Sequence, residues 1–284
     1  ELKVSKLLYP LPLDSPLKQI PIPTCSSEEK QLFAGFINGY RLCGGINLPK
    51  QIYIFSEDKS PVSQLVKGKD DVRQDAVMEQ VFLRVNRLLA SDSETRRRAL
   101  SMRTYRVIPL RPLVGILEWV QNSIPLATYL TEAHGRLNPG DLSPSKCRDL
   151  LRAEAERPGS TVQSKMNVLL KEVGQRFKPV LRHFFFEHFT MNKWWTAKQA
   201  FISSMATASI VGWIVGLGDR HGMNILLDKH TGQVVHIDLN MIFEAGRTLR
   251  IPERVPFRLT PDCVDGLGPE GIALEKKKKN HAIA

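Results

Sequence analysis

The first half of the chain contains short runs of mainly apolar and β-branched residues that polar turns separate. Gln51 to Phe55 (QIYIF) and Ser63 to Lys67 (SQLVK) flank the polar stretch Ser56 to Pro61 (SEDKSP). Two such runs on either side of a turn predict a β-hairpin. Tyr105 to Leu110 (YRVIPL) and Val114 to Val120 (VGILEWV) predict two further strands.

Helical spacing occurs on both sides of the hairpin. Asp70 to Ala90 predicts a helix whose apolar face consists of Val77, Val81, Val85 and Leu88, with Phe82 and Leu89 beside them. Glu28 to Leu42 predicts a short helix that Gly44-Gly45 would end. Residues 1 to about 30 are rich in Pro and Ser, which predicts an extended entry segment.

The second half of the chain has a different character. Gln163 to Phe177, Val180 to Phe189 and Lys198 to Gly216 predict helices. Two short strand-like runs follow, Ile225 to Leu227 and Val234 to Leu239. A turn at residues 230–232 would join these two runs into a second hairpin.

Length and composition allow two lobes. With 284 residues, of which 42% are apolar, the chain can bury one large core or two smaller ones. We predict an α+β fold, with a small β-rich N-lobe and its entry segment over residues 1–117. A larger helical C-lobe, whose C-terminal end is incomplete, would cover residues 118–284. The chain begins at Glu1, and we interpret it as a piece of a longer protein.

Cysteine usage and the longest apolar run each exclude a class of protein. The four cysteines lie far apart and form no C-x-x-C pair, which argues against a zinc site or a disulfide framework and fits a reducing compartment. Ala200 to Gly218 carries no charge and is nearly long enough to span a membrane. It is rich in Ser, Thr, Ala and Gly and leads directly into charged residues, so a buried helix is the better interpretation.

The net charge is +11, which would attract nucleic acid, acidic lipid or phosphate-rich ligands. An alternative is that the chain lacks acidic partners from the rest of its protein. Basic residues cluster only at Arg96 to Arg98 and at Lys276 to Lys279. No basic stripe is interleaved with aromatic residues, so the sequence does not favour binding of single-stranded nucleic acid.

Candidate chemistry lies in three separate segments. Phosphoryl transfer needs a cation on the ATP phosphates, carboxylates for Mg²⁺ and a group that orients the attacking hydroxyl. Asp219 and Asn224 have the Asp-x-x-x-x-Asn spacing of a kinase catalytic loop, and Asp238 on the next hairpin could supply a second metal ligand. Lys67 ends a predicted strand, and Asp75 lies in the helix that follows.

Each of these residues alone has an ordinary interpretation as a solvated charge, a helix cap or a salt-bridge partner. Their order along the expected elements favours a kinase. Two other nucleotide-binding classes are excluded. Gly216-Leu217-Gly218 follows a helix rather than a strand, unlike a dinucleotide fingerprint, and no G-x-x-x-x-G-K-[ST] loop occurs.

Longer motifs narrow the family. Asp219-Arg220-His221 inverts the His-Arg-Asp order of ordinary protein kinases and resembles the phosphatidylinositol 3-kinase superfamily. The segments that resemble its related protein kinases are LVKGKDDVRQDAVMEQVF (65–82), TRRRALSMRTYRVIPL (95–110), GILEWV (115–120), SIVGWIVGLGDRHGMNILL (209–227), HIDL (236–239) and VPFRLTPDCVDGLG (255–268). The resemblance runs from about Pro21 to Gly268. It implies a two-lobed protein-kinase-like fold of the phosphatidylinositol 3/4-kinase type.

The resemblance also implies roles for matching residues. Lys67 would bind the ATP phosphates, and Asp70 and Asp75 would position it. Asp219 would orient the substrate hydroxyl as the catalytic base. His221 would stabilise charge on the transferred phosphoryl group.

Metal and adenine sites follow in the same way. Asn224 and Asp238 would hold Mg²⁺. Adenine would bind at the connector formed by Glu118, Trp119 and Val120, where backbone groups read the base edge and Trp119 packs on its face. The residues that match apolar walls of the pocket are Leu65, Tyr105, Leu226 and Ile237. For these four, ordinary core packing is an equally good interpretation.

The implied function is an ATP- and Mg²⁺-dependent serine/threonine protein kinase. Among the related kinases, the motifs are most similar to the branch that acts in the nucleus in DNA-damage checkpoint signalling and telomere maintenance and prefers Ser/Thr-Gln sites. That branch implies a large helical-repeat polypeptide, a DNA-damage sensor complex as partner, and homodimerisation through regions outside this chain.

Two alternatives remain, a phosphoinositide lipid kinase and a non-catalytic scaffold. Lipid kinases of the superfamily carry a lysine-rich cluster between the metal Asp and the V-P-F motif, whereas Leu239 to Val255 contains three separated arginines, Arg247, Arg250 and Arg254, and no lysine. A scaffold would lack the metal or base residues that are present here.

The sequence departs from the family pattern in three places. Asp238-Leu239-Asn240 stands where the family has Asp-Leu-Gly or Asp-Phe-Gly, and we expect Asn240 to take the left-handed backbone of that glycine. The turn Ser56 to Pro61, which would cover the phosphates, has no glycine. After Gly268 the family's final helices and C-terminal cap are not recognisable.

Overall fold

The computed structural model describes residues 8–10, 20–25, 31–44, 47–249, 253 and 258–268. It divides the chain into two compact units. Unit 1 consists of Glu1–Asn122 together with Asp238–Ile242, and unit 2 consists of Ser123–Ile237 together with Phe243–Ala284. A β-rich N-terminal part and a helical remainder agree with the predicted α+β fold.

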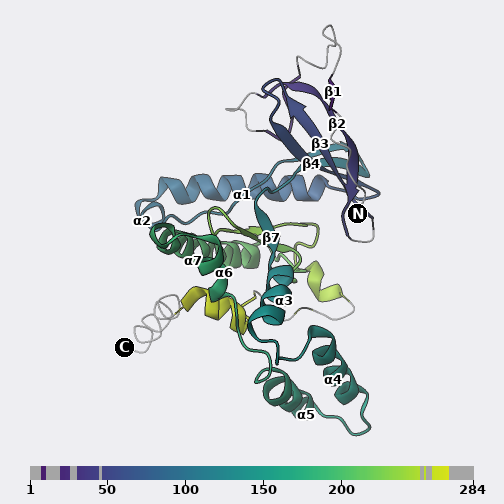
Figure 1. The fold of residues 1–284 in the computed structure, drawn as a ribbon, viewed down its shortest axis with the longest axis vertical. Helices are drawn as coiled ribbons and strands as arrows, with labels where there is room; N and C mark the ends of the chain where they lie inside the picture. The colour runs from purple at the N-terminus through teal and green to yellow at the C-terminus, as the bar shows by residue number, and fades with distance from the viewer. Residues whose placement is uncertain are drawn as a thin grey trace. The chain divides into compact units, whose positions relative to one another are not determined.

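Unit 1 is built on a six-stranded antiparallel sheet with strand order β1-β2-β3-β4-β6-β5. Figure 1 labels its strands β1 to β4. The strands are β1 (Leu8–Pro10), β2 (Phe33–Leu42), β3 (Lys50–Ser56), β4 (Pro61–Gly68), β5 (Val107–Arg111) and β6 (Val114–Glu118). The predicted hairpin is confirmed, since β3 and β4 pair from Phe55 opposite Pro61 to Lys50 opposite Val66.

The predicted helix over Glu28 to Leu42 is wrong, because residues Phe33–Leu42 form strand β2. Gly35 and Gly39 weaken a helix at these positions. Pairing with both β1 and β3 satisfies the backbone groups of β2 instead. Gly39 has φ +96° and lies where the β2–β3 register shifts, so the strand uses its freedom for a bulge.

Helix α1 (Arg73–Ser91) is the long helix of unit 1, and the short α2 (Ser93–Arg97) follows it. The predicted apolar face of α1 is confirmed only in part. Phe82 is 1% exposed and Val81 and Val85 are half-buried, but Val77 is 54% exposed and Leu88 is 64% exposed. The residues that α1 buries are Asp75, Met78, Glu79 and Phe82. The buried face therefore includes two carboxyl groups, which a search for apolar periodicity does not find.

Unit 2 is mainly helical. Its elements are β7 (Ser123–Pro125), α3 (Leu126–Leu137), α4 (Pro144–Glu156), α5 (Val162–Asn167), the π-helix η2 (Val168–Val173), α6 (Arg182–His188), α7 (Met191–Ile214), β8 (Ile225–Asp228), β9 (Val234–His236), the 3₁₀-helix η3 (Ala245–Thr248) and a helix over residues 261–268. Strands β7, β8 and β9 form a three-stranded antiparallel sheet. The predicted second hairpin is thus present, and β7 is an additional strand.

Two helices of unit 2, α3 and α4, were not predicted, although the sequence contains a signal for each of them. Helix α4 begins with Ser143, whose hydroxyl accepts a hydrogen bond from the Lys146 N–H, and with Pro144 at its first position. Helix α3 has apolar residues at helical spacing, and it buries Leu126, Tyr129 and Ala133.

The core of unit 2 lies between α3, α6, α7 and the small sheet. Its largest fully buried side chains include Phe184, Phe185 and Phe201. Helix α7 buries one stripe that contains Phe201, Ser204 and Ala208, and the Ser204 hydroxyl accepts the Val234 N–H at 2.9 Å. This contact fixes α7 against β9. Within the part of the chain that the structure describes, no helix has the length and apolar character needed to cross a membrane.

Several sequence-based expectations fall outside the described residues. They concern Arg250, Arg254, the V-P-F motif at 255–257 and the lysines at 276–279.

Candidate functional site

Lys67 is a buried cation of unit 1. It lies on β4 opposite Gly115 of β6, and only 7% of the residue is exposed. Its Nζ is 3.3 Å from Asp70 Oδ2 and 3.4 Å from Asp238 Oδ1. Burial acts to lower the pKa of Lys67, but the carboxylates of Asp75, Asp238 and Asp70 outweigh it and raise the pKa. Lys67 therefore stays charged at neutral pH.

Asp75 contacts the backbone in addition to its charge interaction with Lys67. It is 1% exposed, and its Oδ1 accepts the Leu239 N–H at 2.9 Å. Gln74, its neighbour on α1, donates to the Asn240 carbonyl at 2.6 Å. Burial raises the pKa of Asp75, while the Lys67 charge opposes the rise. The first turn of α1 thus fixes the backbone that follows Asp238 and acts on Lys67 only through charge.

The expectation about Asn240 is wrong, because the left-handed residue of the Asp-Leu-Asn triplet is Asp238, with φ +58°. Asn240 is exposed and has no positive φ. The hydrogen bonds of Leu239 and Asn240 to α1 hold the triplet in this conformation. An aspartate tolerates a left-handed backbone better than most residues, so no glycine is needed here.

The glycine-free turn between β3 and β4 is stabilised by Asp58. Its Oδ1 accepts hydrogen bonds from the Ser56 hydroxyl and from the Ser60 N–H and hydroxyl, at 3.0 and 2.7 Å for the two Ser60 groups. Hydrogen bonds from Ser56 and Ser60 lower the pKa of Asp58 to about 2. Lys59 supplies the left-handed residue, with φ +62°.

The expected adenine connector directly follows β6. Leu65 pairs with Leu117 across β4 and β6, and Glu118 ends β6. The Trp119 N–H donates to the Ser63 carbonyl at 3.4 Å, so the chain stays beside β4 past the end of the strand. The Arg41 guanidinium lies 6.0 Å from the Trp119 ring centroid, at the outer limit of a cation–π contact. Val120 is 8% exposed.

Tyr105 and Glu79 form a buried polar pair beside this connector. Glu79 Oε2 accepts the Tyr105 N–H at 3.1 Å, and both residues are at most 5% exposed. Burial raises the pKa of Glu79 to about 8, and the charges of Asp75 and Glu118 add to the rise. Glu79 is therefore protonated at neutral pH.

This protonation gives a testable dependence of stability on pH. The pKa of Glu79 is higher in the folded chain than the ordinary 4.5, so folding binds a proton between these values. Stability should fall as pH rises from about 4.5 to about 8. Glu79→Gln is expected to remove this slope and to stabilise the chain at pH 8 by about 2–4 kcal/mol. Urea unfolding between pH 5 and 8.5 measures how the free energy of unfolding depends on pH. Exposed Glu57→Gln is the control, and an unchanged slope in Glu79→Gln would contradict the protonation.

The loop from Gly218 to Asn224 lies in unit 2. Asp219 is left-handed, with φ +57°, and its N–H donates to both carboxylate oxygens of Glu253, at 3.0 and 2.9 Å. The Asn224 side-chain nitrogen donates to the Asp219 carbonyl at 2.9 Å, which leaves the Asn224 amide oxygen for a metal ion. His221 Nε2 is 3.9 Å from Asp219 Oδ2, and both side chains are more than one third exposed.

Arg220 connects this loop to the hairpin that precedes Asp238. Its guanidinium donates to the Gly218 carbonyl at 2.7 Å and to the Ile237 carbonyl at 2.8 Å. The Ile237 N–H in turn donates to the Asn224 carbonyl at 3.0 Å. Leu226 is 7% exposed and pairs with Val235 across β8 and β9, so it is a core residue of the small sheet. The contacts that Arg220 and Glu253 make with this loop were not predicted from the sequence.

The structure thus sorts the predicted site residues into two groups. Unit 1 contains Leu65, Lys67, Asp70, Asp75, Tyr105, Glu118, Trp119, Val120 and Asp238. Unit 2 contains Asp219, His221, Asn224, Leu226 and Ile237. The chain passes from one group to the other at the peptide bond between Ile237 and Asp238.

The metal ligands expected from the sequence fit a cation that keeps most of its ligands from substrate and water. No group of three or more His, Cys, Asp or Glu side chains among the described residues could hold a metal ion by itself. Asn224 and Asp238 offer one amide oxygen and one carboxylate. Mg²⁺ is commonly bound in this way, through one or two protein oxygens together with phosphates and waters.

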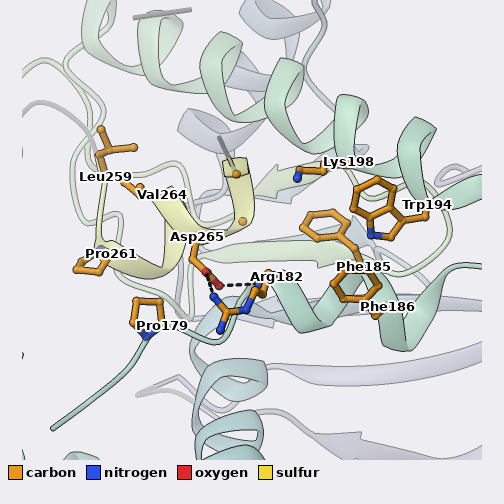
Figure 2. A pocket seen from close by; sticks show the side chains of 12 residues that line it. Pro179, Arg182, Phe185, Phe186, Trp194, Lys198, Leu259, Pro261, Val264 and Asp265 are labelled. Atoms are coloured by element: carbon orange, nitrogen blue, oxygen red, sulfur yellow. Dashed lines mark hydrogen bonds and ion pairs between the residues drawn. The ribbon is translucent and has the colours of Figure 1, made fainter. Parts of the chain in front are cut away.

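A cavity of about 680 Å³ lies elsewhere in unit 2, between α6, α7 and the helix of residues 261–268 (Figure 2). Phe185, Phe186 and Trp194 form its aromatic wall. Arg182 pairs with Asp265 at 2.9 Å, and the Lys198 ammonium lies 5.0 Å from the Trp194 ring centroid. None of the predicted site residues lines this cavity, and it offers no nucleophile beside a general base.

The chain is similar to known proteins over most of its length. The model of the family described as phosphatidylinositol 3- and 4-kinase matches residues 61–281. The chain is 46% identical over 253 residues to the serine/threonine-protein kinase tel1 of Schizosaccharomyces pombe, an alignment that covers 88% of this chain and 9% of that protein. It is 45% identical over 238 residues to the serine-protein kinase ATM of Sus scrofa, covering 82% and 8% of the two chains.

Solved structures are similar over the same region. The structure described as the FAT and kinase domain of CtTel1 matches with a TM-score of 0.80 and 40% identity over 93% of this chain and 20% of that chain. The complete CtTel1 dimer with C2 symmetry matches with a TM-score of 0.82 and 40% identity, over 94% and 11%. The chain spans about a tenth of the length of these curated relatives.

Proposed function

Because this chain belongs to the phosphatidylinositol 3- and 4-kinase family, we propose that it is the catalytic part of an ATP- and Mg²⁺-dependent serine/threonine protein kinase. The observation that carries the proposal is the buried Lys67, charged and held by Asp70 and Asp238. The loop with Asp219 and Asn224 supplies the remaining groups that phosphoryl transfer needs. Relatives named as serine/threonine-protein kinases support the choice of substrate class.

Each residue has a chemical role in this proposal. Lys67 binds the ATP phosphates, and Asn224 and Asp238 hold Mg²⁺, which when bound neutralises phosphate charge. Asp219 accepts a hydrogen bond from the substrate hydroxyl, orients it for in-line attack and takes its proton. His221 lies beside Asp219 and, when protonated, stabilises negative charge on the transferred group.

The connector binds adenine. Backbone groups of Glu118 and Val120 read the base edge, and Trp119 packs on its face. The contact between the Trp119 N–H and the Ser63 carbonyl supports a fixed course of the chain at this point. Buried Tyr105 lies behind the connector with Glu79, and Leu65 completes an apolar wall. Of the two unit 2 candidates, Leu226 is a core residue of its own sheet, and Ile237 holds the catalytic loop through its backbone.

A protein substrate is favoured over a phosphoinositide. Arg247 is the one arginine of the Leu239–Val255 segment whose surroundings the structure describes, and its guanidinium is 2.8 Å from Glu244 Oε1. A cation that binds an inositol phosphate headgroup must be available for phosphate, whereas Arg247 is paired with a carboxylate. The segment contains no lysine, so it lacks the compact cations on which lipid kinases of the superfamily rely. The catalytic residues are all present, which disfavours a non-catalytic scaffold.

We also propose the biological setting that the motif resemblance implies. It is a nuclear role in DNA-damage checkpoint signalling and telomere maintenance, with a DNA-damage sensor complex as activating partner. Similarity to proteins named tel1 and ATM supports the kinase part of this proposal. The CtTel1 dimer with C2 symmetry supports homodimerisation. We propose that the dimer forms through regions outside this chain, in a large helical-repeat polypeptide.

A peptide assay tests the proposed substrate. We expect kcat/KM for a Ser-Ala peptide to be at least roughly tenfold lower than for the matched Ser-Gln peptide, because a pocket built for an amide leaves polar groups unpaired when it holds alanine. The full chain is assayed beside phosphatidylinositol vesicles and an Asp219→Asn variant as the inactive control. Equal rates on both peptides, or a preference for the vesicles, would contradict the proposal.

A further inference from the structure

We propose that Glu253 is a positioning residue for the catalytic loop, and that its carboxylate holds the backbone of Asp219 in its working conformation. The inference rests on the proposed function, because it takes Asp219 as the catalytic base. Glu253 lies 34 residues further along the chain, yet its Oε1 and Oε2 are 3.0 and 2.9 Å from the Asp219 nitrogen. The contact is with the backbone of Asp219, so Glu253 acts through Asp219 and does not replace it.

Asp219 needs such support because of its backbone. Its φ of +57° is left-handed, a conformation that aspartate adopts more readily than most residues but less readily than glycine, so contacts that hold it matter. The Asn224 side chain holds the Asp219 carbonyl at 2.9 Å, and Glu253 holds its N–H. Both backbone polar groups of Asp219 are thereby fixed. The Asp219 side chain is 37% exposed, and its Oδ2 lies 3.4 Å from the Asn224 side-chain nitrogen and 3.9 Å from His221 Nε2. Its carboxylate is therefore open to a substrate hydroxyl on the exposed side.

Two glycines make the space that the Glu253 carboxylate occupies. A Cβ added to Gly218 would lie 2.6 Å from Glu253 Oε2, and one added to Gly246 would overlap the same oxygen. The Glu253 N–H also donates to the Gly246 carbonyl at 3.1 Å. The carboxylate therefore fits a niche that only residues without a side chain leave open. This niche joins the catalytic loop to η3 through Gly246.

Kinetics of Glu253 variants in the full chain test the inference. For Glu253→Ala, with a Ser-Gln peptide, we expect kcat to fall at least roughly tenfold while KM for ATP stays within about twofold. Glu253→Gln keeps an oxygen that can accept the Asp219 N–H, so kcat should stay within about threefold of the parent. Glu244→Gln removes the same charge from the same segment, where Glu244 pairs with exposed Arg247, and should leave kcat unchanged.

A second variant tests the niche without changing Glu253. Gly246→Ala displaces the carboxylate, so it should lower kcat about as much as Glu253→Ala does. The double variant should have the same kcat as the less active of the two single variants, because both changes remove the same interaction. This result holds even where Glu253→Ala reduces the yield of folded protein.

Three results would overturn the inference: parental kcat in Glu253→Ala, equal losses in Glu253→Ala and Glu253→Gln, or additive losses in the double variant. Asp219→Asn separates these from failure of the proposed function. Near-parental kcat in Asp219→Asn would overturn the catalytic assignment and this inference together. Inactive Asp219→Asn beside fully active Glu253→Ala would overturn the inference alone.

Discussion

Replacing Asp238 by alanine is expected to abolish Mg²⁺-dependent ATP turnover while unit 1 stays folded. The Asp238 carboxylate is 3.4 Å from the Lys67 ammonium, so it lies where the ATP phosphates are proposed to bind. A metal ion contributes several kcal/mol to stabilising the transition state, and each 1.36 kcal/mol changes the rate tenfold. Loss of its carboxylate ligand should therefore lower kcat at least roughly a thousandfold.

The backbone of Asp238 decides which variant is the cleaner test. Alanine at φ +58° costs about 1–2 kcal/mol, whereas asparagine tolerates this conformation. Asp238→Asn should thus lose activity with little change in thermal stability. Asp71→Asn is the matched control, since Asp71 is a nearby aspartate whose ion pair with Arg73 is at the surface. Near-normal turnover in a folded Asp238→Asn variant would place the metal carboxylate elsewhere.

Local spacing predicted the parts of the site that lie close together in sequence. The six residues from Asp219 to Asn224 close on themselves, because the Asn224 side chain bonds the Asp219 carbonyl five residues earlier. The β3–β4 hairpin that carries Lys67 was predicted for the same reason. Such elements depend on turn chemistry and on alternation over a few residues, both of which are readable from the chain.

Contacts between distant segments were not predictable in this way. The buried face of α1 carries Asp75 and Glu79, and these carboxyl groups are buried because Leu239 and Tyr105 donate backbone N–H groups to them. The nearer of these two donors is 26 residues away in sequence. Apolar periodicity therefore selected the exposed residues Val77 and Leu88. Strand β2 was mistaken for a helix because its pairing with β1 and β3 is a tertiary effect.

Replacing Lys67 by arginine should cause the second large loss of kinase activity, although the positive charge is kept. Lys67 is 7% exposed, and its compact ammonium is placed within 3.4 Å of both Asp70 and Asp238. A guanidinium is wider and planar, so it cannot occupy the same point between the carboxylates and the phosphates. We expect kcat/KM for ATP to fall at least roughly a hundredfold. The displaced cation would stabilise the phosphate charge in the transition state less well, and removal of one preorganised donor causes a loss of this size.

The melting temperature distinguishes a loss of phosphate binding from damage to the fold of unit 1. A neutral residue at position 67 would leave the carboxylates of Asp70, Asp75 and Asp238 without a buried cation, and the unit should unfold more easily. Arginine keeps that cation, so Lys67→Arg should change the melting temperature only modestly while activity is lost. Lys69→Arg, at an exposed lysine two residues further on, is the matched control and should leave both quantities unchanged. Parental kcat/KM for Lys67→Arg at limiting ATP would show that Lys67 does not bind the phosphates, and that its ion pairs with Asp70 and Asp238 serve the fold alone.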